Sequence, residues 1–193
     1  MAVVWASRVL RQSLPERVAG IDLFEELLGL AHRERYSVYL LGAEQAVLQE
    51  VIERVNARYP GVRIAGSRNG YFGRDQEAEV AANVRDARPD ILFVAITPPK
   101  KEIFLATWGR VMSVPVCHGV GGSFDVMAGK VKRAPVLWQR VGLEWLYRTL
   151  QEPRRLWKRY LVTNSIFLWM VLRELVRGGS EPEISESEAN ASV

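Results

Sequence analysis

The fold is decided by residues 90–100, which read Asp-Ile-Leu-Phe-Val-Ala-Ile-Thr-Pro-Pro-Lys. Six successive apolar residues, 91–96, are typical of a strand that is buried on both faces of a sheet. Pro98 and Pro99 end this run, and a helical pattern follows from Lys100 to Met112. A buried strand that leads directly into a helix predicts one unit of a parallel α/β sheet.

The same unit recurs on both sides of this stretch. Apolar runs predict further strands at residues 37–41, 62–65 and 114–117. Apolar residues at helical spacing predict helices at residues 43–59 and 75–87. We therefore expect an α/β fold with a Rossmann-like parallel sheet and helices on both faces, over residues 1–134.

From Pro135 onwards the pattern contains helices only. We expect one helix over residues 136–150 and a second over residues 153–177, separated by Glu152-Pro153. The Ser/Glu-rich end of the chain has no aromatic residues, which predicts disorder. The expected domains are the α/β domain (1–134), a helical appendage (135–178) and a disordered acidic tail (179–193).

The positive charge is concentrated in the helical appendage. Residues 130–178 hold 11 basic and 3 acidic residues, whereas residues 1–129 hold 15 of each. Aromatic residues lie among the arginines, and the apolar run at residues 161–172 is shorter than the roughly 20 residues that span a bilayer. A basic helix of this kind suits the membrane interface, although a helix docked on the sheet with solvated arginines explains it equally well.

Three loops follow predicted strands and should meet at the carboxyl edge of the sheet, where parallel α/β folds bind ligands. Residues 66–72 combine glycines with Arg68, which suits a phosphate, and with Tyr71, which can stack on a base or sugar. Residues 97–102 bring two lysines to a helix N-terminus, which favours an anion. Residues 119–125 form a glycine-rich turn that ends in Asp125. Each loop alone is explained by a simple turn, but together they indicate a nucleotide-type ligand.

The sequence offers no metal-binding pattern, because Asp-x-Asp is absent and His32 and His118 lie far apart. We assign no metal and no cofactor, and we interpret both histidines as structural. The single cysteine, Cys117, excludes an internal disulfide framework and is expected to be a small buried residue at the end of a strand. No signal peptide follows Met1, so we expect a cytoplasmic protein.

At these loops the sequence resembles the WecG/TagA/CpsF family of bacterial glycosyltransferases. The matching blocks include Gly-Tyr-Phe at 70–72, Pro-Lys-Lys-Glu at 99–102 and Gly-Val-Gly-Gly-Ser-Phe-Asp at 119–125. The other blocks lie in the same order along the chain, at residues 3–8, 17–23, 40–42, 90–94, 129, 133–135, 142–148, 152–155 and 159–160. The resemblance covers nearly everything from residue 3 to about residue 177.

The resemblance implies an inverting, metal-independent hexosyltransferase. It would move an N-acetylmannosamine-type sugar, or its uronic acid, from a UDP donor to N-acetylglucosamine on undecaprenyl diphosphate, in the synthesis of teichoic acid or another cell-surface polysaccharide. The enzyme would be peripheral on the inner face of the cytoplasmic membrane, bound through its C-terminal helices.

The resemblance also implies roles for particular residues. The donor pocket would be lined by Arg68, Tyr71, Phe72, Pro99, Lys100, Lys101, Gly121 and Gly122. The acceptor's diphosphate would be held by Arg148, Arg155 and Arg159, because guanidinium groups match phosphate oxygens. The carboxylates placed to assist the reaction would be Asp125 and Glu102.

Two departures from the family's pattern matter. Relatives carry about 60 further residues before the Val-Val-Trp-Ala-Ser block, including an aspartate that is the usual candidate for general base. We therefore expect Met1 to be an internal methionine of a longer protein. Lys101 replaces the glutamine of the family's Pro-Lys-Gln-Glu, which would favour a more anionic donor.

Two other functions stay open at this point. A truncated, non-catalytic relative could bind a nucleotide or a lipid diphosphate at the membrane. A nucleic-acid-binding protein would suit the pI near 9.4, but the apolar run inside the basic segment has no use in such a site. Self-association through the apolar helix, giving a homo-oligomer, is a further alternative.

Overall fold

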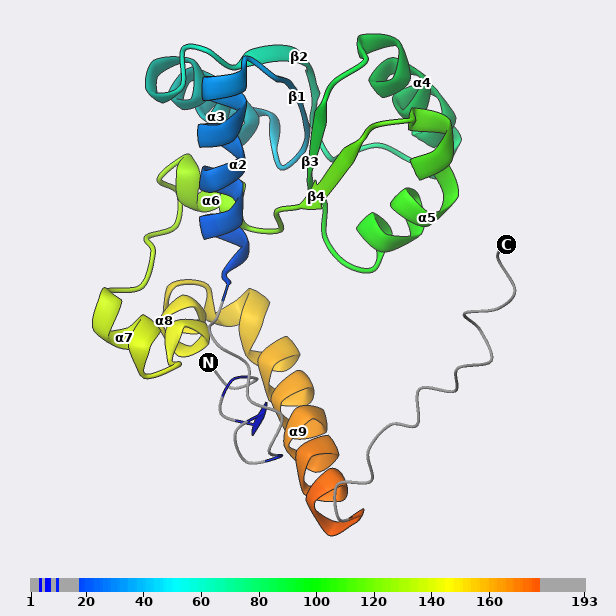
Figure 1. Ribbon diagram of the computed structural model, residues 1–193. Helices are drawn as coiled ribbons and strands as arrows, with labels where there is room; N and C mark the ends of the chain where they lie inside the picture. The colour runs from blue at the N-terminus through cyan, green and yellow to red at the C-terminus, as the bar shows by residue number, and fades with distance from the viewer. Residues whose placement is uncertain (1–3, 5, 8–9, 11–17, 178–193) are drawn as a thin grey trace, which may run out of the picture. The chain divides into compact units, whose positions relative to one another are not determined.

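The computed structural model describes residues 4, 6, 7, 10 and 18–177, and these fall into two units (Figure 1). One unit spans residues 18–133, and the other combines residues 134–177 with the few described residues before residue 18. The boundary expected after residue 134 stays a prediction. The expected acidic tail, residues 179–193, lies outside the described residues.

The unit of residues 18–133 is built on a parallel sheet. Its four strands are β1 (Ser37–Gly42), β2 (Arg63–Arg68), β3 (Ile91–Ala95) and β4 (Val116–Gly119). Their order is β2-β1-β3-β4, and every neighbouring pair is parallel. The predicted α/β architecture is confirmed. Strand β2 runs to Arg68, beyond the expected end at residue 65, because its last residues pair with Tyr39–Leu41 of β1.

Helices cover both faces of this sheet, as Figure 1 shows. The first face packs against α2 (Gly20–Glu34), α3 (Gln45–Arg58) and α6 (Ser123–Met127). The second face packs against α4 (Glu77–Ala87) and α5 (Lys100–Met112). The strands contribute alternate residues to the two layers, for example Leu40 and Phe93 to the first and Leu41 and Val94 to the second.

The strand order places a switch point between β1 and β3. The chain leaves β1 through α3 towards β2, and it leaves β3 through α5 towards β4, on the other side. The loops that follow β1 and β3 therefore diverge at the carboxyl edge of the sheet. In open α/β sheets this divergence is where ligands bind.

Three details differ from the expectations or were not anticipated. Helix α2, whose buried residues Phe24, Leu28 and Ala31 repeat at helical spacing, was not predicted. Cys117 was expected to be buried, but it is exposed, because β4 is an edge strand. The short 3-10 turn η1 (Arg74–Gln76) precedes α4.

The amino edge of the sheet is held by Asp90 and by His32. The Asp90 carboxylate accepts hydrogen bonds from the backbone N–H and the hydroxyl of Ser37, both at 2.7 Å. His32 accepts a hydrogen bond through Nδ1 from the backbone N–H of Gly61, at 2.8 Å. Both contacts fasten the beginning of a strand to a neighbouring element, so the structural role expected for His32 is confirmed.

The unit's two ends lie side by side. Arg133, the last residue of the unit, donates a hydrogen bond to the carboxylate of Asp22, in the first turn of α2. Asp22 lies only four residues after Val18, where the unit begins. The ion pair therefore joins the place where the chain enters this unit to the place where it leaves.

The second unit is helical. It contains α7 (Val136–Arg140), α8 (Glu144–Gln151) and α9 (Pro153–Arg177). The single helix expected at residues 136–150 is wrong, because the backbone turns into the left-handed region at Gly142, with φ at 78°. Two aromatic pairs pack within the unit, Trp138 on Tyr147 and Trp145 on Tyr160. Among the described residues, no helix is long and apolar enough to cross a membrane.

Candidate functional site

Four loops meet at the carboxyl edge of the sheet and are joined by backbone hydrogen bonds. The N–H of Ala43, after β1, donates to the carbonyl of Ala95, at the end of β3, at 2.9 Å. The N–H of Gly70, after β2, donates to the carbonyl of Ala43 at 3.0 Å. The N–H of Val120, after β4, donates to the carbonyl of Val94 at 3.0 Å. These bonds hold the four loops in fixed positions relative to one another.

The closest approach in this network requires a glycine. Gly42 has a φ of 132°, a region that other residues rarely adopt. A Cβ atom at this position would lie 2.4 Å from the backbone of Ala95. Gly42 thus lets β1 and β3 approach at the switch point and gives the following loop its direction.

Lys100 joins two of the predicted loops. Its Nζ donates to the backbone carbonyl of Phe72 and lies over the Phe72 ring, 4.0 Å from the ring centroid. The Phe72 side chain is itself buried and packs edge-on against Phe104 of α5. The structure therefore buries the Phe72 side chain in the core, with Lys100 in contact with it. Pro99 is the residue that precedes Lys100 and α5.

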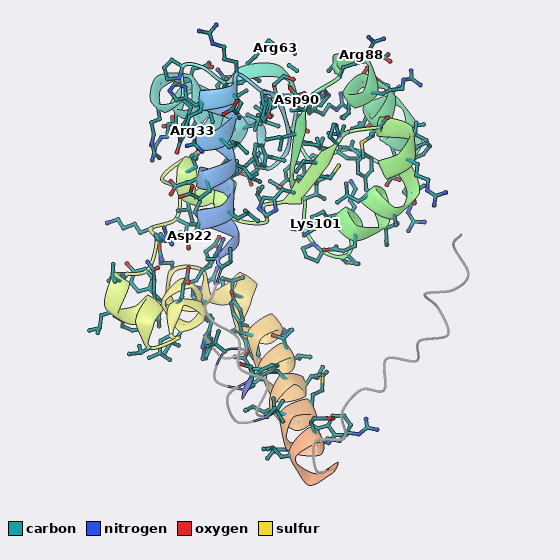
Figure 2. The ribbon with its side chains drawn as sticks, in the orientation of Figure 1. Asp22, Arg33, Arg63, Arg88, Asp90 and Lys101 are labelled. Atoms are coloured by element: carbon teal, nitrogen blue, oxygen red, sulfur yellow. The ribbon has the colours of Figure 1, made fainter. Side chains whose placement is uncertain are left out.

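Lys101 lies on the other side of the α5 N-terminus, towards β4. Its Nζ would be 2.9 Å from a Cβ placed on Gly119, and it forms an ion pair with Glu102 at 3.1 Å. The pKa of Glu102 is lowered, first by a hydrogen bond from the backbone N–H of Glu102 itself and then by the Lys101 ammonium. Figure 2 shows Lys101 at the end of the sheet opposite Asp90 and Arg63, which is the carboxyl edge.

The loop after β2 presents an exposed aromatic ring. Tyr71 is 73% exposed, and its backbone N–H donates to the side chain of Asn69 at 3.1 Å, which shapes the turn. Arg68 ends β2 just before this loop, and its Nε is buried without a hydrogen-bond partner among the described residues. Its charge also acts on Tyr39, whose pKa is raised by burial and lowered in part by Arg68.

The glycine-rich turn after β4 leads into α6. Gly121 has a φ of 52°, and a Cβ there would meet nothing within 4 Å, so the turn is open on this side. Gly122 precedes the first residue of α6, and Asp125 lies in this short helix, half-buried. The backbone carbonyl of Asp125 accepts a hydrogen bond from Val131 at 3.1 Å, which folds the following segment back towards the site.

The three predicted acceptor-binding arginines belong to the helical unit. Arg148 lies in the last turn of α8, and its Nε is buried without a hydrogen-bond partner in the described part of the chain. Arg155 and Arg159 lie in the first turns of α9, but their side chains are outside the described residues.

Sequence reasoning missed two charged residues at the carboxyl edge. Glu44 follows β1, and Lys130 follows α6, and their side chains form an ion pair at 2.7 Å. The glycine after β1 was a visible signal for a fourth loop, but nothing in the sequence links two residues 86 positions apart. No group of three His, Cys, Asp or Glu side chains that could hold a metal ion occurs among the described residues.

Comparison with known proteins identifies the family to which the chain belongs. Residues 1–181 match the model of the WecG/TagA/CpsF glycosyl transferase family. The chain is 40% identical over 161 residues to an N-acetylglucosaminyldiphosphoundecaprenol N-acetyl-beta-D-mannosaminyltransferase of Bacillus subtilis (strain 168). It is 42% identical over 161 residues to a protein of the same name from Bacillus spizizenii. Each match covers 83% of this chain and 62% of the relative.

The α/β unit with its loops gathered at a switch point defines a doubly wound fold of the ligand-binding class, and the matches identify its family. The chain belongs to the WecG/TagA/CpsF family, and the resemblance inferred from its motifs is confirmed. It spans 62% of the length of the curated relatives that it matches.

Proposed function

We propose that this protein transfers an N-acetylmannosamine-type sugar from a UDP donor to N-acetylglucosamine carried on a polyprenyl diphosphate. The observation that carries the proposal is the carboxyl edge of the sheet at the β1/β3 switch point, where Lys101 begins α5, Arg68 ends β2 and Tyr71 lies on the loop that follows β2. The names of the two Bacillus relatives state the same sugar and the same acceptor.

The proposed donor site uses the charges and rings of these loops. Tyr71 is exposed and suited to stacking on the uracil or the sugar, and the N-terminus of α5 with Lys101 favours the diphosphate. Cations at the diphosphate stabilise the negative charge that develops on the departing UDP. Lys100 and Phe72 hold the loop in place from behind, as positioning residues.

The proposed reaction is a single displacement with inversion at the anomeric carbon. The acceptor hydroxyl loses its proton to a carboxylate and attacks the sugar on the side opposite the diphosphate, which leaves with the electron pair of the broken bond. Among the carboxylates at this edge of the sheet, Asp125 and Glu102 are the two that the family resemblance assigns to this step. Glu102 is held in an ion pair with Lys101 at 3.1 Å, which occupies its charge, so we assign the base to Asp125.

The helical unit supplies the proposed acceptor and membrane contacts. Along α9, large apolar side chains are exposed, among them Leu161, Ile166, Leu168, Trp169 and Leu172. Arg173 lies beside Trp169, with its guanidinium 5.3 Å from the ring centroid. Apolar side chains flanked by arginines suit an interface of anionic lipid, and Arg148, Arg155 and Arg159 would bind the acceptor's diphosphate. We propose that the enzyme acts peripherally on the membrane.

The test is transfer of labelled sugar from UDP-N-acetylmannosamine to a short-chain polyprenyl-diphosphate N-acetylglucosamine. The chain is assayed beside any longer form that its reading frame encodes, and UDP binding is measured in parallel by calorimetry. Transfer that is lost in Asp125→Asn but kept in Glu102→Gln supports the proposal and the assignment of the base. UDP binding without transfer by either form contradicts the transferase and supports a binding module.

A further inference from the structure

An ion pair joins two segments of the carboxyl edge that are remote in sequence. Lys130 Nζ lies 2.7 Å from Glu44 Oε2, so a residue that follows α6 is held against the loop after β1. The side chains are 45% and 54% exposed. An exposed pair of this kind contributes at most about 1 kcal/mol to folding, so stability alone does not account for a lysine at this position.

The backbone that carries Lys130 is fixed from beneath. Arg54 of α3 donates to the carbonyl of Met127 at 2.7 Å and is itself held by Glu50 at 2.6 Å. Gly129 has a φ of 75° and lies against the Arg54 guanidinium. The chain therefore turns at a fixed point, and this turn directs Lys130 towards Glu44.

The surroundings of Lys130 come from three of the four loops. Lys130 donates a hydrogen bond to the Glu44 carboxylate, which raises the pKa of Lys130, and the charges of Asp125 and Tyr71 add to this effect. These residues follow β1, β4 and β2, respectively. Lys130 is thus a cation placed among the loops of the proposed donor site, with Glu44 as its ion-pair partner.

We propose that Lys130 binds the diphosphate of the nucleotide donor and that Glu44 is the counterion which the diphosphate displaces. This inference rests on the proposed function. A lysine ammonium is a mobile point charge on a flexible stem, so it can turn from one anion to another without a change in the backbone. Glu44 then competes with the ligand, because both need the same ammonium group.

The two members of the pair should have opposite effects on binding. Lys130→Gln removes the cation and is expected to weaken UDP binding about tenfold, the size of one charge-assisted contact. Glu44→Gln removes the competitor and is expected to strengthen UDP binding a few-fold. Lys130→Arg keeps the charge and should retain most of the affinity. A purely structural latch predicts instead that both neutral variants weaken binding in the same direction, which would overturn the proposal.

Calorimetry with three ligands decides the assignment. Uridine lacks phosphates and should bind the Lys130→Gln variant and the unaltered protein with equal affinity. UDP should bind the variant more weakly than the unaltered protein. Farnesyl diphosphate represents the lipid-linked acceptor, and a loss confined to this ligand would overturn the donor assignment. The matched control is the exposed ion pair of Glu25 and Arg58, at the opposite end of α3, whose neutral variants should leave UDP binding unchanged.

Failure of the inference differs from failure of the proposed function. If the unaltered protein binds UDP but Lys130→Gln binds it equally well, only the inference is wrong. If the unaltered protein binds no UDP, both are wrong. Thermal unfolding of each variant checks that any loss of binding does not come from loss of the fold.

Discussion

The ammonium of Lys100 lies over the ring of Phe72 and donates a hydrogen bond to the backbone carbonyl of the same residue. One side chain of α5 thus holds the loop after β2 by two interactions. Lys100 was expected to bind the donor, which stays a prediction, and its contacts with Phe72 assign it a second role in holding the loop. We propose that this second role acts on the donor through the position of Tyr71, which precedes Phe72.

Replacement of Lys100 should therefore affect stability as well as activity. We expect Lys100→Met to lower the free energy of unfolding by about 1–2 kcal/mol, because it removes a cation–π contact and a charged hydrogen bond. Urea unfolding followed by circular dichroism measures this change. Arg110→Met, at the exposed end of the same helix, is the control. Equal stability of the two variants would contradict the role assigned to Lys100.

The glycine at the switch point gives a second prediction. Gly42→Ala should lower the free energy of unfolding by more than about 2 kcal/mol, because its Cβ would clash with the Ala95 backbone and its φ is unfavourable. Gly109→Ala, in α5, meets nothing within 4 Å and should be neutral or stabilise the protein by up to about 1 kcal/mol. Chemical denaturation of both variants measures this difference in unfolding free energy. Equal stability of the two variants would contradict the close approach of Gly42 to the Ala95 backbone.

The amino edge should make stability depend on pH. Hydrogen bonds from the backbone and the hydroxyl of Ser37 lower the pKa of Asp90. A carboxyl group whose pKa is lower in the folded state contributes stability above its unfolded pKa of about 4, and this is lost as the pH falls through the folded pKa. The contribution should not exceed about 1 kcal/mol, because Asp90 is exposed.

The unaltered protein and Asp90→Asn should therefore differ in unfolding free energy at pH 7, and this difference should shrink as the pH falls below the unfolded pKa of about 4. Asp86→Asn, on the surface of α4, controls for the change in net charge. A constant difference between the unaltered protein and Asp90→Asn across this pH range would show that Asp90 does not act through its charge.

The helical unit offers a test of membrane binding. Leu168→Glu places a carboxylate among the exposed apolar side chains of α9 and should reduce binding to anionic vesicles at least tenfold in a sedimentation assay. Leu168→Phe keeps the side chain apolar and should bind normally. Binding of the unaltered protein should weaken as salt rises, because arginines contribute to it. Equal binding to oligonucleotides and vesicles would instead favour a nucleic-acid partner.

The parts of the fold that the sequence predicted are those set by short-range patterns. The helix at Lys100–Met112 was predicted with the bounds that the structure shows, because two prolines precede it and its apolar residues repeat at helical spacing. Strand β3 was predicted because its apolar run is continuous. The break at Gly142 was missed, because the apolar spacing on both sides continues as if one helix spanned it.

The candidate site was predictable only where a loop carried its own signal. Glycines and charges marked the loops after β2, β3 and β4, and the structure brings these loops to one edge. The pairing of Glu44 with Lys130 depends on the turn at Gly129 and on Arg54 beneath it, which no local pattern encodes. The buried position of Phe72 likewise follows from packing against α5.

The ion pair between Asp22 and Arg133 has a consequence for how the chain can be divided. Because entry and exit of the α/β unit are fastened together, residues 18–133 form a piece whose two ends meet. Such a piece can be excised, or grafted into a loop of another protein, without spreading its ends. We therefore expect the α/β unit to fold with the helices removed, so that it can be studied as a separate module.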